Sequence, residues 1–234
     1  MTSTAAVIGS TGLTGSYILS TLLSLDAFKA IHTISRRAPN AESPKLAATI
    51  EADTAKWASS LSSIKPTPAT VFSALGTTRA QAGGIANQWK IDHDLNVEIA
   101  KAARAAGVKT YVFISSTGTR NLVSSQLPYS KMKIGVEDSI KELAFEQAII
   151  VRPGAILGER EVAHTGGAFI NTFIHGLGST LGRGWQDKLG QDADVIGRAA
   201  VRAAVLAAEG KAPSQYWVLE PADIVKLGRD EWKA

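Results

Sequence analysis

The chain has 234 residues, of which 45% are hydrophobic and 20% are charged, the composition of an ordinary soluble globular protein. Its net charge of +4 comes from residues scattered along the chain, which argues against a nucleic-acid-binding protein. The absence of cysteine excludes disulfides, thiolate catalysis and cysteine-ligated metal sites and is typical of a reducing compartment such as the cytoplasm. The four histidines lack the spacing of metal ligands, and no apolar run of about 18 residues predicts a membrane-spanning helix.

Segments typical of strands alternate with segments typical of helices. Strands are expected at 7–9, 31–35, 47–52, 70–75, 110–115, 149–151 and 216–219. Helices are expected at 13–25, 57–61, 86–106, 128–143 and 193–208. This order predicts an α/β fold, a Rossmann-like doubly wound parallel sheet with helices on both faces and the ligand at the carboxyl ends of the strands. We expect one NAD(P)-binding domain over residues 1–234, in which about 155–190 and the C-terminal end form a small substrate lobe.

The first strand leads into a glycine-rich turn that opens a helix. The turn reads Gly9-Ser10-Thr11-Gly12-Leu13-Thr14-Gly15. Glycines allow a sharp turn and a close approach to a pyrophosphate, and the helix N-terminus offers unpaired N–H groups to the phosphates. The spacing differs from the Gly-x-Gly-x-x-Gly of ordinary dehydrogenases, but the position between a strand and a helix favours a dinucleotide site.

The end of the second strand indicates which nucleotide binds. NAD-binding folds usually place a carboxylate there for the ribose 2′-hydroxyl, whereas this strand ends Ser35-Arg36-Arg37. Two guanidinium groups suit a 2′-phosphate, so the sequence favours NADP(H), and the Ser35 hydroxyl is a further candidate contact. Asp53 is placed either to approach the adenine or to cap a turn.

A candidate catalytic set lies where the fifth strand ends and the next helix begins. Tyr129 and Lys133 are four residues apart and share one helix face. A lysine ammonium beside a bound nicotinamide favours the phenolate, so Tyr129 is the candidate acid/base. Ser116, or its neighbour Thr117, is the candidate hydroxyl for polarising a carbonyl. Asn96, on the long helix, is expected to cap or pack rather than to react.

These residues together resemble the short-chain dehydrogenase/reductase superfamily in its shorter, atypical branch. The resemblance becomes closer to the Tat-interacting oxidoreductase group and its fungal relatives, which include peripheral proteins of the mitochondrial outer membrane. Its more specific segments are Ser35-Arg36-Arg37, Leu75-Gly76-Thr77-Thr78-Arg79, Val151-Arg152-Pro153-Gly154 and Glu159-Arg160.

The resemblance implies a role for each matching residue. Arg36 and Arg37 hold the 2′-phosphate of NADPH, Leu75 and Gly76 lie on the adenosine–ribose side, and Tyr129 and Lys133 lie at the nicotinamide ribose. The remaining residues assigned to the cofactor site are Ser115, Arg152, Pro153 and Arg160.

The predicted function is NADP(H)-dependent hydride transfer to or from a small carbonyl-type substrate. A sensor that binds NADPH without turnover is the alternative, and a lyase or isomerase is a third class. The apolar stripe Phe169–Leu177 is expected to pack on the sheet or a dimer partner, with a substrate lid or membrane-docking face as alternatives. The helices expected at 86–106 and 128–143 are candidates for a homodimer interface. For the second of them, packing in the core of the monomer is the alternative. The expected location is the cytoplasm, or the periphery of the mitochondrial outer membrane.

Overall fold

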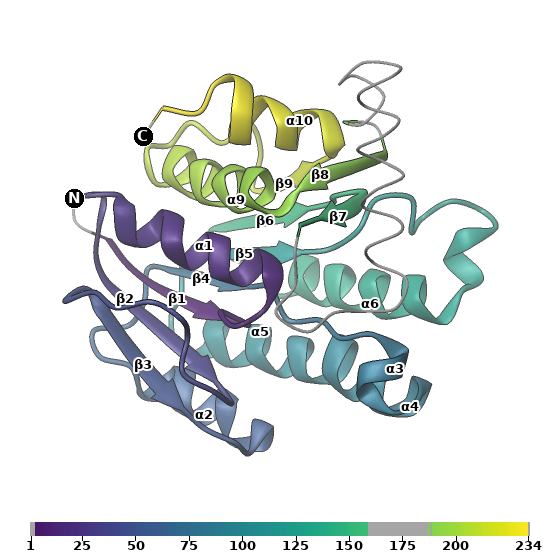
Figure 1. The fold of residues 1–234 in the computed structure, drawn as a ribbon, viewed down its shortest axis with the longest axis horizontal. Helices are drawn as coiled ribbons and strands as arrows, with labels where there is room; N and C mark the ends of the chain where they lie inside the picture. Colours follow the sequence, from purple (N-terminus) through teal and green to yellow (C-terminus); the bar gives the residue numbers. More distant parts are fainter. Residues whose placement is uncertain (1–2, 159–186, 188, 234) are drawn as a thin grey trace.

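A computed structural model describes residues 3–158, 187 and 189–233, and its main feature is a seven-stranded parallel sheet (Figure 1). The strand order is β3–β2–β1–β4–β5–β6–β9, so the chain reverses its direction of travel across the sheet between β1 and β4. This confirms the predicted Rossmann-like fold, whose ligands bind at that reversal point. The strands are β1 Ser3–Ile8, β2 Phe28–Ser35, β3 Leu46–Ile50, β4 Thr70–Ser73, β5 Thr110–Ile114, β6 Gln147–Val151 and β9 Tyr216–Leu219.

Helices cover both faces of the sheet and enclose two hydrophobic cores (Figure 1). β1 is fully buried from Ala5 to Ile8, and its side chains alternate between the two cores. Such a strand reads as an uninterrupted apolar run because both of its faces are covered. One face is covered by α1 Leu13–Ser24 and α9 Ala193–Ala208, the other by α2 Trp57–Ser63, α5 Asn96–Ala105 and α6 Pro128–Glu142.

The long helix predicted at 86–106 is helical over almost that range but is not uniform. It consists of α4 Ile85–Trp89, a π-helical segment Lys90–Leu95, and α5. Asn96 follows the π-helical segment and is fully buried, and its Nδ2 donates to the carbonyls of Ile91 and Asp92 at 3.2 Å. The side chain therefore satisfies carbonyls in a locally widened turn, which agrees with the expected packing role.

Several short elements were absent from the sequence-based expectation. They are α3 Arg79–Ala82, the two-stranded parallel sheet of β7 Ala155–Leu157 and β8 Gly190–Asp192, and α10 Pro221–Val225 with the π-helical segment Lys226–Asp230 that follows it. Each is too short to show a periodic pattern. The apolar stripe Phe169–Leu177 lies outside the described residues, as does most of the expected substrate lobe. Among the residues described, no helix is long and apolar enough to cross a bilayer.

Candidate functional site

The glycine turn after β1 lies against the end of β4, at the reversal point of the sheet. Gly9 has φ +86°, and a Cβ there would lie 2.8 Å from the carbonyl oxygen of Ala74. A Cβ on Gly15 would lie 2.0 Å from the carbonyl oxygen of Gly9, and the N–H of Gly12 donates to that same oxygen at 3.0 Å. Gly9 and Gly15 are thus needed for the close approach of α1 to the strand end.

Two features of this turn fit a bound phosphate. Ser10 is 1% exposed and its hydroxyl has no hydrogen-bond partner among the described residues, an arrangement that buried hydroxyls normally avoid. The N-cap position of α1 is Gly12, so no side chain caps the first N–H groups of the helix. Unpaired donors at a helix N-terminus are what a pyrophosphate requires, and the residues present therefore fit the nucleotide that the sequence predicts.

The end of β2 carries two unpaired cations. Arg36 and Arg37 are exposed, and neither guanidinium group forms a hydrogen bond or ion pair with any residue the structure describes. Ile34 is paired with Ile8 of β1, which places the arginines at the same edge of the sheet as the glycine turn. The hydroxyl of Ser35 is engaged, because it donates to the carbonyl of Arg37 at 2.7 Å.

Asp53 follows β3 and serves as a cap. Its Oδ1 accepts from the N–H of Ala55 at 3.0 Å, at the start of the 3₁₀ turn Thr54–Lys56. This contact matches the capping alternative. A contact between Asp53 and an adenine stays a prediction.

The loop after β4 is hydrogen-bonded to a buried carboxylate, that of Asp92, which the sequence analysis did not single out. Oδ1 of Asp92 accepts from the N–H of Thr77 at 2.7 Å, and its Oδ2 accepts from Gln88 Nε2 at 3.2 Å. Burial raises the pKa of Asp92, while the charge of Lys133 and the two hydrogen bonds oppose the rise. Leu75 is buried and Gly76 is exposed. The hydrogen bond from the Thr77 N–H to Asp92 anchors the loop that carries both residues.

Tyr129 and Lys133 come from the first turns of α6 but differ in environment. The Tyr129 ring is 42% exposed, and its hydroxyl has no partner within the described ranges. Lys133 is 5% exposed; its Nζ donates to the carbonyl of Ile114 at 3.0 Å and lies 4.9 Å from the centre of the Phe113 ring. The ammonium is thus fixed at the carboxyl end of β5, close to the expected position of the nicotinamide.

The three hydroxyl residues after β5 are held unequally. Ser115 donates to Glu137 Oε1 at 2.6 Å, and Thr117 Oγ1 donates to Glu220 Oε2 at 3.1 Å. Ser116 between them accepts at its carbonyl from Thr119 Oγ1 at 3.3 Å, but among the described residues its hydroxyl makes only a 3.5 Å contact, to the carbonyl of Thr117. Of the three, Ser116 therefore has the hydroxyl most available to a ligand.

Glu137 is the second buried carboxylate that the sequence analysis missed. Its side chain is fully buried, and it accepts hydrogen bonds from Ser115, Arg120 and Arg152. Burial alone raises its pKa, but the hydrogen bonds from Arg152, Ser115 and Arg120 bring the pKa of Glu137 below its ordinary value. The one available signal was a glutamate four residues after Lys133, on the face of α6 that also carries buried apolar residues.

The remaining predicted cofactor residues lie after β6. The guanidinium of Arg152 donates to Glu137 and to Glu220, and the buried Pro153 accepts at its carbonyl from the N–H of Thr117. Both residues thus border the end of β5. Arg160 lies outside the described residues.

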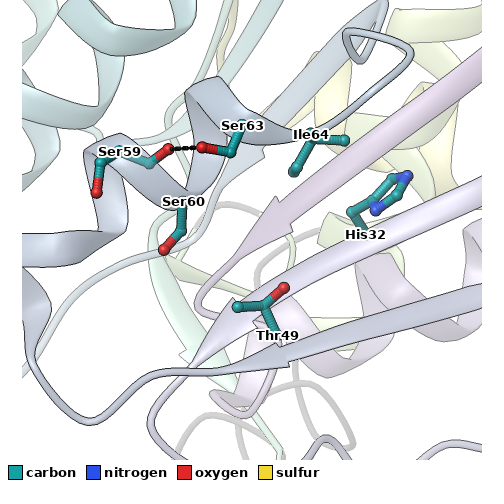
Figure 2. A pocket seen from close by; sticks show the side chains of 6 residues that line it. All are labelled: His32, Thr49, Ser59, Ser60, Ser63 and Ile64. Atoms are coloured by element: carbon teal, nitrogen blue, oxygen red, sulfur yellow. Dashed lines mark hydrogen bonds between the residues drawn. The ribbon is translucent and has the colours of Figure 1, made fainter.

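A pocket of about 430 Å³ lies elsewhere, between β2, β3 and α2 (Figure 2). His32, Thr49 and Ile64 line it with the serines of α2, and Figure 2 shows the Ser63 hydroxyl bonded to the Ser59 carbonyl. Burial lowers the pKa of His32, so its imidazole is neutral near pH 7. None of the predicted site residues lines this pocket, so it does not identify the nucleotide site.

Two fungal proteins are similar to this chain over almost its whole length. Protein FMP52, mitochondrial, of Chaetomium globosum is 64% identical over 227 residues, which cover 97% of each chain. Protein fmp52-2, mitochondrial, of Aspergillus oryzae is 64% identical, over 98% of this chain and 99% of its own length. These names agree with the mitochondrial part of the expected location and give no support to a cytoplasmic one.

The fold also resembles a solved structure, MoeE5 in complex with UDP-glucuronic acid and NAD. The TM-score is 0.68 at 18% identity, over 92% of this chain and 75% of that one. A family model described as "NAD dependent epimerase/dehydratase family" matches residues 5–189, which include the glycine turn, Tyr129, Lys133 and Arg152. The chain therefore belongs to the NAD dependent epimerase/dehydratase family, and its relatives include the fungal FMP52 proteins.

Proposed function

We propose that the protein is an NADP(H)-dependent oxidoreductase that transfers hydride to or from a carbonyl-type substrate, with Tyr129 as the acid/base. The observation that carries the choice of NADP(H) is the pair of exposed guanidinium groups of Arg36 and Arg37 directly after β2, which have no partner in the part of the chain that the structure describes. A 2′-phosphate matches their fork geometry and charge, and the second strand ends without the carboxylate that a ribose 2′-hydroxyl usually receives.

The described residues supply the parts of such a reaction. When bound, the nicotinamide supplies or accepts the hydride. Tyr129 exchanges the proton at its Oη, which has no hydrogen-bond partner among the described residues. Ser116 Oγ donates a hydrogen bond to the carbonyl oxygen of the substrate. Lys133, whose Nζ donates to the Ile114 carbonyl at the end of β5, is the proposed cationic partner of Tyr129 in this proton transfer.

Ser116 rather than Thr117 is the proposed third hydroxyl. Thr117 Oγ1 is already bound to Glu220, whereas Ser116 has only a long contact to a neighbouring carbonyl. Releasing Thr117 would leave a partly buried carboxylate oxygen of Glu220 without that donor.

Thermal shift tests the cofactor assignment. NADPH should stabilise the protein more than NADH at equal concentration, because only NADPH gains the arginine contacts. The double variant Arg36→Ala/Arg37→Ala should lose this difference, whereas Lys101→Ala, which removes a charge from α5, should keep it. Equal stabilisation of the unmodified protein by both nucleotides would refute the NADP(H) assignment.

Turnover tests the role of Tyr129. In Tyr129→Phe, NADPH affinity and the melting temperature should stay close to those of the unmodified protein, because the hydroxyl has no partner among the described residues. NADPH oxidation with a carbonyl substrate should be abolished. A Tyr129→Phe variant that keeps the full rate would rule out the mechanism.

A sensor without turnover is a second candidate, favoured by the orientation of Lys133. Its ammonium donates to the Ile114 carbonyl, and this contact links α6 to the end of β5 whether or not a reaction takes place. A sensor predicts tight NADPH binding, no oxidation across a broad carbonyl panel, and partner affinity that depends on the nucleotide. A lyase or isomerase is distinguished by its products, since it converts substrate without net consumption of NADPH.

For location, we propose peripheral association with the mitochondrial outer membrane. The mitochondrial names of the fungal relatives support it. Fractionation should recover the protein with mitochondria, and alkaline carbonate should release it. Recovery in the cytosolic fraction alone would contradict the proposal.

A further inference from the structure

An ion-pair network built around the buried Glu137 joins the carboxyl ends of β5 and β6 to the start of α10. Arg152 donates from Nε and Nη2 to the two oxygens of Glu137, at 3.0 and 2.6 Å, and from Nη1 to Glu220 Oε1 at 3.0 Å. Arg120 Nε adds a bond to Glu137 Oε2 at 3.0 Å. Glu220 is the N-cap of α10 and forms a capping box with Asp223, so the network begins at a fixed point of the C-terminal segment.

The network holds the residues on either side of Ser116. Ser115 is fixed by its hydroxyl on Glu137 and by its N–H on the Val151 carbonyl at 2.7 Å. Thr117 is fixed by its hydroxyl on Glu220 and by its N–H on the Pro153 carbonyl at 2.8 Å. The Ser116 backbone is therefore held from both sides, while its hydroxyl is left available.

All three guanidinium nitrogens of Arg152 are in use. A bidentate pair with Glu137 and a third bond to Glu220 use three of its five N–H groups and set its positive charge between two carboxylates. Its side chain is 16% exposed, whereas Arg36 and Arg37 are exposed residues. The arginine of the Arg-Pro-Gly segment thus differs from the two that suit a phosphate.

We propose that Arg152, Glu137 and Glu220 are positioning residues that hold Ser116 for the reaction, and that Arg152 acts through this network and not as a cofactor ligand. The Ser116 part of this inference rests on the proposed function. The restraint of the Ser115–Thr117 segment by the network does not depend on it.

The link between Thr117 and Glu220 offers a matched pair of variants. Thr117→Val removes the hydroxyl with little change in volume, and Thr117→Ser keeps it. Glu220→Gln removes the charge that faces Arg152, and Glu231→Gln, at an exposed ion pair with Lys226, is its control. Arg152→Lys keeps the charge but loses the bidentate geometry.

Three readouts decide the proposal: hydrogen exchange of the peptide that contains Ser115–Thr117, the Kd for NADPH, and kcat and KM for NADPH oxidation with phenanthrenequinone as carbonyl probe. Thr117→Val, Glu220→Gln and Arg152→Lys should exchange roughly tenfold faster, with kcat at least about tenfold lower and KM and Kd within about threefold of the unmodified protein. Thr117→Ser should restore both exchange and kcat, and Glu231→Gln should change neither.

The outcomes separate this inference from the proposed function. Unchanged exchange in Thr117→Val and Glu220→Gln would overturn the network's role, as would a Thr117→Ser variant that fails to restore kcat. A tenfold loss of NADPH affinity in Arg152→Lys with unchanged exchange would assign Arg152 to the cofactor. If the unmodified protein neither binds nor oxidises NADPH, the proposed function and the role of Ser116 fail, and exchange alone still decides whether the network restrains the segment.

Discussion

The contact between Gly15 and Gly9 predicts the outcome of a single added methyl group. In Gly15→Ala the new Cβ would lie 2.0 Å from the Gly9 carbonyl oxygen and 2.7 Å from its carbon. Both atoms are backbone, so no side-chain rotation relieves the overlap. Ordinary contact begins near 3.4 Å, so the first turn of α1 must withdraw by about 1.4 Å from the strand end.

The cost of this withdrawal should be at the upper end of the range for overpacked sites. Such substitutions cost about 1–3 kcal/mol when the neighbours relax, and here the neighbour is the turn itself. A loss of about 3 kcal/mol in a chain of this size lowers the melting temperature by roughly 6–12 °C. Because the moving helix end is the one that faces the phosphates, NADPH affinity should fall as well.

Gly12→Ala is the matched control. Its Cβ would lie 3.3 Å from the same oxygen, and the φ of −86° at Gly12 is open to alanine. We expect a cost of about 1 kcal/mol or less, measured by urea unfolding beside Gly15→Ala. Equal unfolding free energies for the two variants would refute the reasoning, because only the position of the added Cβ distinguishes them.

Three further predictions concern other parts of the fold. Asp92→Asn should lower the unfolding free energy by roughly 1–3 kcal/mol, because the new amide group would place a second donor opposite Gln88 Nε2. Urea unfolding measures this loss, and an unchanged midpoint would contradict the contact. Gly228→Ala, whose Cβ would lie 2.0 Å from the Val195 carbonyl oxygen, should lower the melting temperature and leave the NADPH Kd unchanged. Since the folded pKa of Glu137 is below its unfolded value of about 4.5, the stabilisation from this carboxylate is complete above that pH and is lost as the pH falls through the folded pKa. Urea midpoints should therefore drop as the pH is lowered below about 4.5, and Glu137→Gln should flatten this dependence.

The sequence was sufficient for the sheet because each long element carried its own pattern. The apolar run before Gly9 and the alternation of strands with helices led directly to the parallel sheet. The π-helical segment Lys90–Leu95 left no periodic signal, since one widened turn shifts the apolar positions too little to be seen. β7 and α10 are too short to show any period.

The candidate site was less accessible to sequence reasoning where its chemistry depends on burial. Asp92 and Glu137 lie on helices among other charged residues, and a carboxylate there normally faces solvent. Only tertiary packing brings Asp92 to the backbone of the loop after β4 and places Glu137 between two arginines. For Arg152 the motif is readable from the sequence, but the carboxylates that bind its guanidinium group are not.

The position of Glu220 near the end of the chain affects how the protein is made. β1, β2 and the glycine turn are synthesised first, and their contacts are local enough to form early. Arg152 and Thr117 wait for Glu220, which the ribosome adds 68 and 103 residues later, along with the last strand of the sheet. A nascent chain can therefore possess the glycine turn before the residues around Ser116 are held in place.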